Sequence, residues 1–348
     1  MKKEAYIVLC AALFASPVFA AGGHGIKPPA TTFEIIPLVS DQAGVAPNTD
    51  PDLVNPWGIS HIPGGPNWVA DNGTDKSTVY SRANGTKSNI TVNVIGAPTG
   101  TVAPLDDHDG DTDFPVTKNG NTGASAFIFD TESGTIQGWS GSVDAVNAVV
   151  AVDRSTKGSV YKGLALDSVN QNLYAADFAK NQVQVFDDQW KPIGKFTDTE
   201  LPRRFAPFNV AVINGKVYVA FAKRERGGID ELHGKGLGYV DVFDLGGNLQ
   251  QHLIANGPLN APWGMAIAPS GFGDFAGALL VGNFGDGKVN AFDASTGAFL
   301  GTLSGSDGKP LKIDGLWTLD PGPSNNQVSF SAGPGDETHG LLGLIQPN

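Results

Sequence analysis

Acidic and amide side chains follow short apolar segments throughout this 348-residue chain, and some of them have the chemistry to bind a cation. The candidates are Glu132, Asp177, Asn209 and Asn283, whose oxygens are the ligands that Ca²⁺ and Mg²⁺ prefer. They predict one divalent cation, Ca²⁺ or Mg²⁺, held by several segments. Asn and Asp beside turns also bond to their own backbone, so a structural role is the alternative for each.

Two further residues have side chains that could transfer a proton. Asp71 begins an Asp-Asn-Gly turn, and His339 precedes Gly340. An imidazole titrates near neutral pH, and a carboxylate can act as a base, so both are candidates for acid–base catalysis. The alternative for His339 is that its ring only satisfies a backbone carbonyl.

The most acidic stretch, residues 106–113, holds five carboxylates, among them Asp107, Asp109 and Asp111. Alternating carboxylates repel one another unless a cation binds between them, so these three are further candidate ligands. The stretch is not an EF-hand, because Lys118 stands where the bidentate Glu would be. A solvated acidic loop is the alternative.

The beginning of the chain is typical of a secretory signal. Lys2 and Lys3 precede an apolar run that is too short to cross a bilayer of about 30 Å, and Ala20 ends a small-residue cleavage site. We expect cleavage after Ala20 and a secreted or periplasmic protein, with residues 21–31 as a flexible leader. Cys10 lies within the signal, so the mature chain would have no cysteine, disulfide or thiol nucleophile.

The charge and the motifs exclude several classes of function. The formal net charge is −12, and it becomes −13 without the signal, because 23 basic and 35 acidic residues become 21 and 34. This charge argues against nucleic acid and anionic membrane as partners. A nucleophile elbow, a phosphate loop and a dinucleotide fingerprint are all missing, so no organic cofactor is expected.

These candidate residues are positioned by a repeat of short strands, for which residues 260–303 are the template. Four apolar or alternating segments follow one another there, each closed by Gly, Asp or Asn. First strands with an aromatic or apolar centre are expected in six units. They are expected at residues 55–59, 123–127, 161–165, 206–210, 261–265 and 315–319.

This period predicts a six-bladed β-propeller over residues 32–348, as a single domain and a monomer. The last unit lacks its outer strand, which residues 33–39 would supply, so that the ring has no open edge. A seven-bladed ring is the alternative, but residues 97–122 show no apolar alternation. Trp57 and Trp263 each stand between Pro and Gly, and we expect them to pack in the core, with a stacking platform as the alternative.

One face of the propeller is expected to carry the function. Loops that lead into first strands and turns that follow second strands lie on the same face of an antiparallel blade. Three long insertions are expected in these connections, at residues 97–122, 223–238 and 333–339. Long loops on a rigid scaffold commonly bind ligands.

Several motifs together are similar to an uncharacterised family of exported bacterial β-propellers, of which some members end in an exosortase sorting tail. They include Asn55-Pro-Trp57-Gly58, Tyr161-Lys162-Gly163, residues 282–287 and residues 339–343. The resemblance covers nearly the whole mature chain and implies no established reaction. This chain has no sorting tail, from which we expect a soluble form.

The blade pattern more distantly resembles NHL-type propellers, gluconolactonases and streptogramin lyases. That resemblance implies a divalent ion over the channel, held by Glu, Asn and Asp, that polarises an ester or lactone. Two functions stay open at this point. One is a metal-assisted hydrolase or lyase of small esters or lactones, and the other is a non-catalytic propeller that binds a small-molecule, saccharide or matrix ligand.

Overall fold

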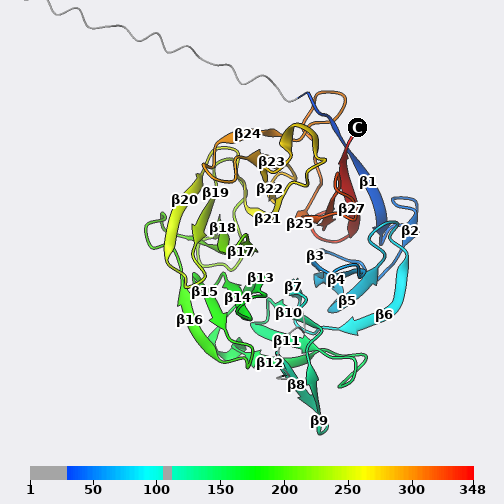
Figure 1. Ribbon diagram of the computed structural model, residues 1–348, viewed down its shortest axis with the longest axis vertical. Helices are drawn as coiled ribbons and strands as arrows, with labels where there is room; N and C mark the ends of the chain where they lie inside the picture. The colour runs from blue at the N-terminus through cyan, green and yellow to red at the C-terminus, as the bar shows by residue number, and fades with distance from the viewer. Residues whose placement is uncertain (1–29, 105–111) are drawn as a thin grey trace, which may run out of the picture.

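Six antiparallel sheets surround a central axis in the computed structural model, which describes residues 30–104 and 112–348 (Figure 1). The chain is therefore an all-β, six-bladed propeller, as the repeat predicts. The first three blades are β3 (Pro56–Ser60), β4 (Asn67–Asp71), β5 (Lys76–Tyr80) and β6 (Lys87–Asn93); β7 (Pro98–Val102), β10 (Phe127–Thr131), β11 (Thr135–Trp139) and β12 (Val149–Asp153); and β13 (Tyr161–Asp167), β14 (Asn172–Asp177), β15 (Gln182–Phe186) and β16 (Pro192–Phe196).

The other blades follow in chain order, each running from the innermost strand to the outer rim. They are β17 (Phe205–Ile213), β18 (Lys216–Lys223), β19 (Gly238–Phe243) and β20 (Leu249–Ala255); β21 (Pro262–Ile267), β22 (Leu279–Asn283), β23 (Val289–Phe292) and β24 (Phe299–Thr302); and β25 (Leu316–Pro321), β26 (Val328–Ala332), β27 (Leu341–Pro347) and β1 (Phe33–Ser40). The described part of the chain has no helix long and apolar enough to cross a membrane.

The ring is closed by the two ends of the described chain, as predicted. β1 pairs antiparallel with β27 from Phe33 opposite Pro347 to Ser40 opposite Leu341, and the blue and red strands lie side by side in Figure 1. A short strand, β2 (Asn48–Thr49), adds to the outside of β1. Closure leaves blade 6 with a paired outer strand instead of an open edge.

Blade 2 differs from the expectation. Its innermost strand is β7, and the segment that ends at Phe127 is the second strand of the blade, β10. Residues 103–104 and 112–126 therefore belong to a connection from a first strand to a second one, and they lie on the face opposite to the one predicted. Their hairpin, β8 (Pro115–Lys118) and β9 (Asn121–Ala124), is held against blade 3 where Trp190 Nε1 donates to the Pro115 carbonyl at 2.7 Å.

The innermost strands approach one another too closely for a side chain at some positions. A Cβ on Gly58 would lie 2.7 Å from the Thr99 carbonyl, and one on Gly264 would lie 2.5 Å from the Trp317 carbonyl. Both are closer than non-bonded carbon and oxygen atoms come. The glycines after Trp57 and Trp263 therefore allow neighbouring innermost strands to approach each other closely.

Residues before the innermost strands adopt a left-handed backbone in most blades. Asn55 has φ 46°, Ala97 has φ 59° and Ala261 has φ 45°, directly before β3, β7 and β21. Such values are uncommon for residues other than glycine and persist where the surroundings fix them. The repeated turn places the residue equivalent to Trp57 in each blade at the same end of the channel, which we call the turn face.

Candidate functional site

The side chains at the turn face of the channel come from one repeated position. The second residue of the Pro-Trp-Gly motif and its equivalents in the other blades gives the set Trp57, Thr99, Lys162, Phe208, Trp263 and Trp317. Four of the six are aromatic, and these four pack in one buried cluster. Packing is thus their observed role. Lys162 is the one charged side chain in this ring of equivalent positions.

Lys162 lies on an aromatic floor. Its ammonium nitrogen is 5.3 Å from the centroid of Trp57, 5.6 Å from that of Phe178 and 5.8 Å from that of Phe208. Its side chain keeps only 3% of its exposed area. A cation over aromatic faces is attracted by their electrons, and the attraction grows when water is removed.

Three carboxylates surround the same ammonium group. Lys162 Nζ lies 3.1 Å from Glu132 Oε1, 3.6 Å from Asp230 Oδ1 and 3.7 Å from Glu231 Oε2. Burial lowers the pKa of Lys162, but Glu132, Glu231 and Asp230 raise it by more, so the net shift is upward. Lys162 therefore stays protonated and is neither a base nor an amine nucleophile at neutral pH.

Amide side chains extend this cluster around the channel. Asn72 Nδ2 donates to Glu132 Oε2 at 3.1 Å, and Asn55 Nδ2 donates to Asn72 Oδ1 at 3.2 Å and to Glu337 Oε2 at 2.7 Å. Asn55 Oδ1 in turn accepts a hydrogen bond from the Trp317 indole at 2.9 Å. We call Lys162, Glu132, Glu231, His233 and Glu337 the mouth cluster, and it joins blades 2, 3, 4 and 6.

The surroundings shift the pKa values of two carboxyl groups of the mouth cluster, Glu231 and Glu337, in opposite directions. Burial raises the pKa of Glu337, and nearby Glu231 adds to the rise. Burial also acts upward on Glu231, but His233 and Lys162 outweigh it and lower its pKa. Hydrogen bonding to Glu231 raises the pKa of His233, whose Nε2 lies 3.6 Å from Glu231 Oε1. Groups separated in this way can serve as a base and an acid at one pH.

A pocket of about 390 Å³ opens beside the mouth cluster, between blades 5 and 6. His233 and Glu337 belong to its wall, with Phe284, Asp314, Asp336 and Lys312. Asp336 and Glu337 have φ values of 51° and 64°, so the loop that carries them is held in a left-handed conformation. Carboxylates outnumber basic groups in this wall, so the pocket favours neutral or positively charged molecules over anions.

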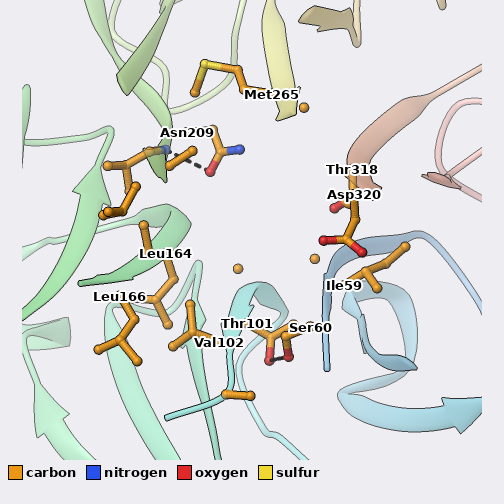
Figure 2. Close-up of a pocket in the computed structure, with 18 of the residues that line it drawn as sticks. Ile59, Ser60, Thr101, Val102, Leu164, Leu166, Asn209, Met265, Thr318 and Asp320 are labelled. Carbon is orange, nitrogen blue, oxygen red and sulfur yellow. Dashed lines mark hydrogen bonds between the residues drawn. The ribbon is translucent and has the colours of Figure 1, made fainter. Parts of the chain in front are cut away.

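The opposite end of the channel forms a second cavity of about 380 Å³, lined by all six innermost strands. Asp320 is the only carboxylate among its described lining residues, and it points inward from β25 across from Leu164 and Leu166 (Figure 2). Asp320 Oδ2 lies 3.5 Å from His61 Nδ1 and 3.7 Å from Arg82 Nη2. Burial raises the pKa of Asp320 to about 7. The lining of this cavity combines apolar side chains with the polar side chains of Ser60, Thr101, Asn209 and Thr318.

Three of the predicted metal ligands use their side-chain atoms in hydrogen bonds within a blade or between blades. Asp177 accepts from the Val160 and Lys180 amides at 3.2 Å and from Gln184 Nε2 at 2.7 Å. Asn283 bonds to the Asn260 amide and the Pro258 carbonyl. Asn209 donates to the Trp263 carbonyl at 2.8 Å and lines the opposite cavity (Figure 2). These contacts favour the structural alternative for each residue.

The remaining predicted residues lie in three different settings. Glu132 belongs to the mouth cluster, whereas Asp71 is fully buried and accepts from Thr78 Oγ1 at 2.7 Å. The ring of His339 lies 2.9 Å from Asp41 Oδ2 and bonds to Gln42, both in the connection after β1. Asp107, Asp109 and Asp111 lie outside the described residues.

The mouth cluster does not fit a divalent cation in its present arrangement. Its central position is taken by the Lys162 ammonium group, which already neutralises the carboxylates that a Ca²⁺ or Mg²⁺ ion would need. Within the described residues, the one group of three His, Asp or Glu side chains with ligand atoms within 4.8 Å lies elsewhere and is made of Asp198, Asp241 and His252. A shared ion on Glu132 and Asp177 stays a prediction.

Sequence reasoning missed Lys162, Glu231 and Glu337 as members of one site. A signal for Lys162 was available, because Tyr161-Lys162-Gly163 aligns with the Pro-Trp-Gly triplets of blades 1 and 5. A lysine at a position that is aromatic in four blades stands out. Glu231 and Glu337 lie on inserted loops that have no counterpart in other blades. The repeat therefore does not predict where their side chains lie.

The fold and the mouth cluster define the chain as a six-bladed propeller with a charged site at one end of its channel. No family model matches the chain. It is 33% identical over 330 residues to uncharacterized protein R648 of Acanthamoeba polyphaga mimivirus, which covers 90% of this chain and 80% of that protein. Uncharacterized protein L690 of the same virus is 32% identical over 333 residues, covering 90% and 86%. The chain belongs to the family of these proteins.

Solved structures of similar shape are themselves propellers. A streptogramin B lyase matches with a TM-score of 0.53 and 12% identity, covering 91% of this chain and 98% of its own. A luciferin-regenerating enzyme matches with a TM-score of 0.53 and 14% identity, covering 84% and 91%. At this identity the likeness shows the fold alone. The bacterial origin and the export suggested by the sequence resemblance stay predictions.

Proposed function

We propose that the chain is an enzyme that uses acid–base catalysis at the turn face. Its reaction would be the hydrolysis of small esters or lactones, or an elimination that opens them. The observation that carries this proposal is the opposite displacement of Glu231 and Glu337 in pKa around the protonated Lys162. Glu337 and His233 both line the pocket of about 390 Å³, so both can touch a bound molecule. The two propeller enzymes of similar fold are consistent with this class of function.

The geometry suggests a division of roles. Glu337, with its raised pKa, is the base that takes a proton from water or from a substrate carbon, because a base is most effective when its pKa lies near the working pH. His233, kept protonated by Glu231, donates a proton to the leaving oxygen. Lys162 takes no part in proton transfer, and its charge keeps Glu231 ionised. No step needs a metal ion at this site.

The substrate class follows from the pocket wall. Asp286, Asp314, Asp336 and Glu337 face only Lys312 and His233 as basic groups, although Asp286 is paired with Lys288 at 2.8 Å. Anionic esters would be repelled, so we propose a neutral or cationic ester or lactone. Export, a monomeric state and the absence of nucleic acid and membrane partners remain part of the proposal and rest on the sequence.

A panel of neutral, cationic and anionic esters and lactones, assayed with the purified chain across pH, tests the proposal. We expect turnover of a neutral or cationic compound with a bell-shaped pH profile, in which Glu337 sets the acid limb and His233 the alkaline limb. Glu337→Gln and His233→Asn should each lower kcat/KM by about 10²- to 10⁴-fold. Glu225→Gln, at an exposed carboxylate on the inserted loop that also carries His233, is the matched control and should keep full activity.

Two results would contradict the catalytic proposal. One is an absence of turnover across the panel, and the other is a Glu337→Gln variant that is as active as the parent chain. A non-catalytic binding propeller is the second candidate, favoured by the aromatic Phe284 in the pocket wall, which stacks on Trp317 at 3.9 Å. It predicts ligand-induced thermal stabilisation that Phe284→Ala removes and Glu337→Gln leaves in place.

A further inference from the structure

Blade 4 carries a carboxylate at a position where its neighbours carry neutral side chains. Counting two residues before the aromatic residue of each third strand gives Thr78, Gln137, Gln184, Asp241 and Asn290 in blades 1 to 5. Asp241 lies in β19 between Tyr239 and Phe243, which share its face of the strand and pack in the apolar cluster between blades 3 and 4. A fully buried carboxylate in such surroundings is costly unless something compensates its charge.

A second carboxylate and an imidazole meet Asp241 there. Asp198, whose side chain is 1% exposed, comes from the connection between β16 and β17, and His252 comes from the outer strand β20. His252 Nδ1 lies 3.2 Å from Asp198 Oδ2 and 3.3 Å from Asp241 Oδ1. β16 and β20 are the rim strands of neighbouring blades on the left of Figure 1, so the cluster ties blade 3 to blade 4.

The buried oxygens of this cluster are incompletely satisfied. Asp198 Oδ2 and Asp241 Oδ2 are both buried and receive no hydrogen bond. The carboxyl groups of Asp198 and Asp241 thus lie together in a buried position, with the imidazole of His252 beside them. Buried polar atoms without partners are uncommon in folded proteins, and a bound ion is one way to satisfy them.

The spacing suits a small divalent ion with nitrogen and oxygen ligands. Metal–nitrogen and metal–oxygen bonds of about 2.0 to 2.2 Å in tetrahedral or octahedral geometry place neighbouring ligand atoms about 3.0 to 3.5 Å apart. The observed separations of 3.2 and 3.3 Å fall in this range. An imidazole ligand favours first-row transition ions over Ca²⁺ and Mg²⁺, which prefer oxygen alone.

The outer side of the imidazole is arranged as it is in metal sites. Glu200 Oε2 lies 3.5 Å from His252 Nε2, so a proton on Nε2 leaves the Nδ1 lone pair directed at the two carboxylates. Carboxylates behind a ligating histidine commonly fix its tautomer in this way. The His252 side chain is 45% exposed, which leaves an approach for the ion and room for a water ligand.

We propose that Asp198, Asp241 and His252 form a binding site for one divalent transition-metal ion such as Zn²⁺ or Mn²⁺, with Glu200 orienting the histidine. The ion would fasten the connection at Asp198 to the outer half of blade 4. This site is independent of the mouth cluster and of any reaction there. The competing explanation is a proton shared between the two aspartates, with no ion.

Titration of the chelator-treated full-length chain with Zn²⁺, Mn²⁺, Ca²⁺ and Mg²⁺ by calorimetry, with thermal unfolding in parallel, tests the proposal. We expect one Zn²⁺ or Mn²⁺ ion per chain, a higher Tm with the ion, and at least 100-fold weaker binding of Ca²⁺ and Mg²⁺. His252→Gln, at an exposed position, should lower affinity at least 100-fold and remove the rise in Tm. Glu200→Gln should lower affinity about 10- to 100-fold.

Matched variants separate this site from the rest of the molecule. Asp241→Asn reproduces the residue that blade 5 carries at Asn290, so it should fold and lose the ion. Glu337→Gln at the mouth should bind the ion as the parent chain does. Stoichiometric binding that survives His252→Gln, or a chain that binds neither Zn²⁺ nor Mn²⁺ while Asp241→Asn raises its Tm, would overturn the proposal in favour of a shared proton.

Discussion

Lys162 and Glu132 form an ion pair of 3.1 Å between blades 3 and 2, with the lysine side chain 3% exposed. The lysine replaces an aromatic residue of the channel ring, and the glutamate follows the second strand of the neighbouring blade. This pair connects the core of the propeller with the pocket beside it. Removal of either partner would therefore change both stability and the charge balance of the mouth cluster.

Lys162→Met tests the energetic part of this relationship. The substitution keeps much of the apolar stem but leaves Glu132 and the nearly buried Glu231 without their cation, so we expect a loss of about 3 kcal/mol in unfolding free energy. Urea denaturation measures the loss. The double variant Lys162→Met with Glu132→Gln should recover part of it, because one uncompensated charge is removed. A single variant as stable as the parent chain would contradict the assigned pairing.

Gly264→Ala tests the close approach of innermost strands. The added Cβ would lie 2.5 Å from the Trp317 carbonyl, so blades 5 and 6 must separate locally, and we expect a loss of about 1 to 3 kcal/mol. Gly194 in the rim strand β16 is the matched control, because its nearest neighbour would be 3.9 Å away. Gly194→Ala should change stability by less than about 0.5 kcal/mol. Equal effects at both positions would show that the channel packing is looser than the structure has it.

Asp320→Asn tests the partly buried carboxyl group in the opposite cavity, which His61 and Arg82 face. Its pKa is raised by burial from 3.8 to about 7, so between these values the folded chain holds a proton that the unfolded chain releases. Its contribution to stability is therefore full below about pH 4 and is lost as the pH rises to about 7.

The asparagine variant has no such titration. Relative to the parent chain it should gain up to about 4 kcal/mol in unfolding free energy between pH 4 and pH 8, at about 1.4 kcal/mol per pKa unit. Urea denaturation at a series of pH values measures the difference, with the exposed Asp307→Asn as a control that keeps the parent profile. A constant difference between Asp320→Asn and the parent chain would contradict the raised pKa.

The blade pattern was readable from the sequence because it depends on local properties. Alternating apolar residues and turns closed by Gly, Asn or Asp repeat along the chain, and an aromatic residue precedes Asp187, Asp244 and Asp293 in blades 3 to 5. The pairing of β1 with β27 followed from counting strands. β7 was missed because Pro98-Thr-Gly-Thr-Val102 has no apolar alternation, and its strand depends on Gly100 fitting between its neighbours.

The sequence by itself determined the class of fold, the number of blades and the closure of the ring, since each needs only the order and period of strands. Only the tertiary structure decided which polar residues form a site, because that depends on side chains from different blades meeting at one end of the channel. Asp177 and Asn283 lie at matching strand ends, yet the side chain of each accepts a hydrogen bond from a backbone amide of its own blade. Lys162, Glu231 and Glu337 are far apart in the chain and meet because the ring closes.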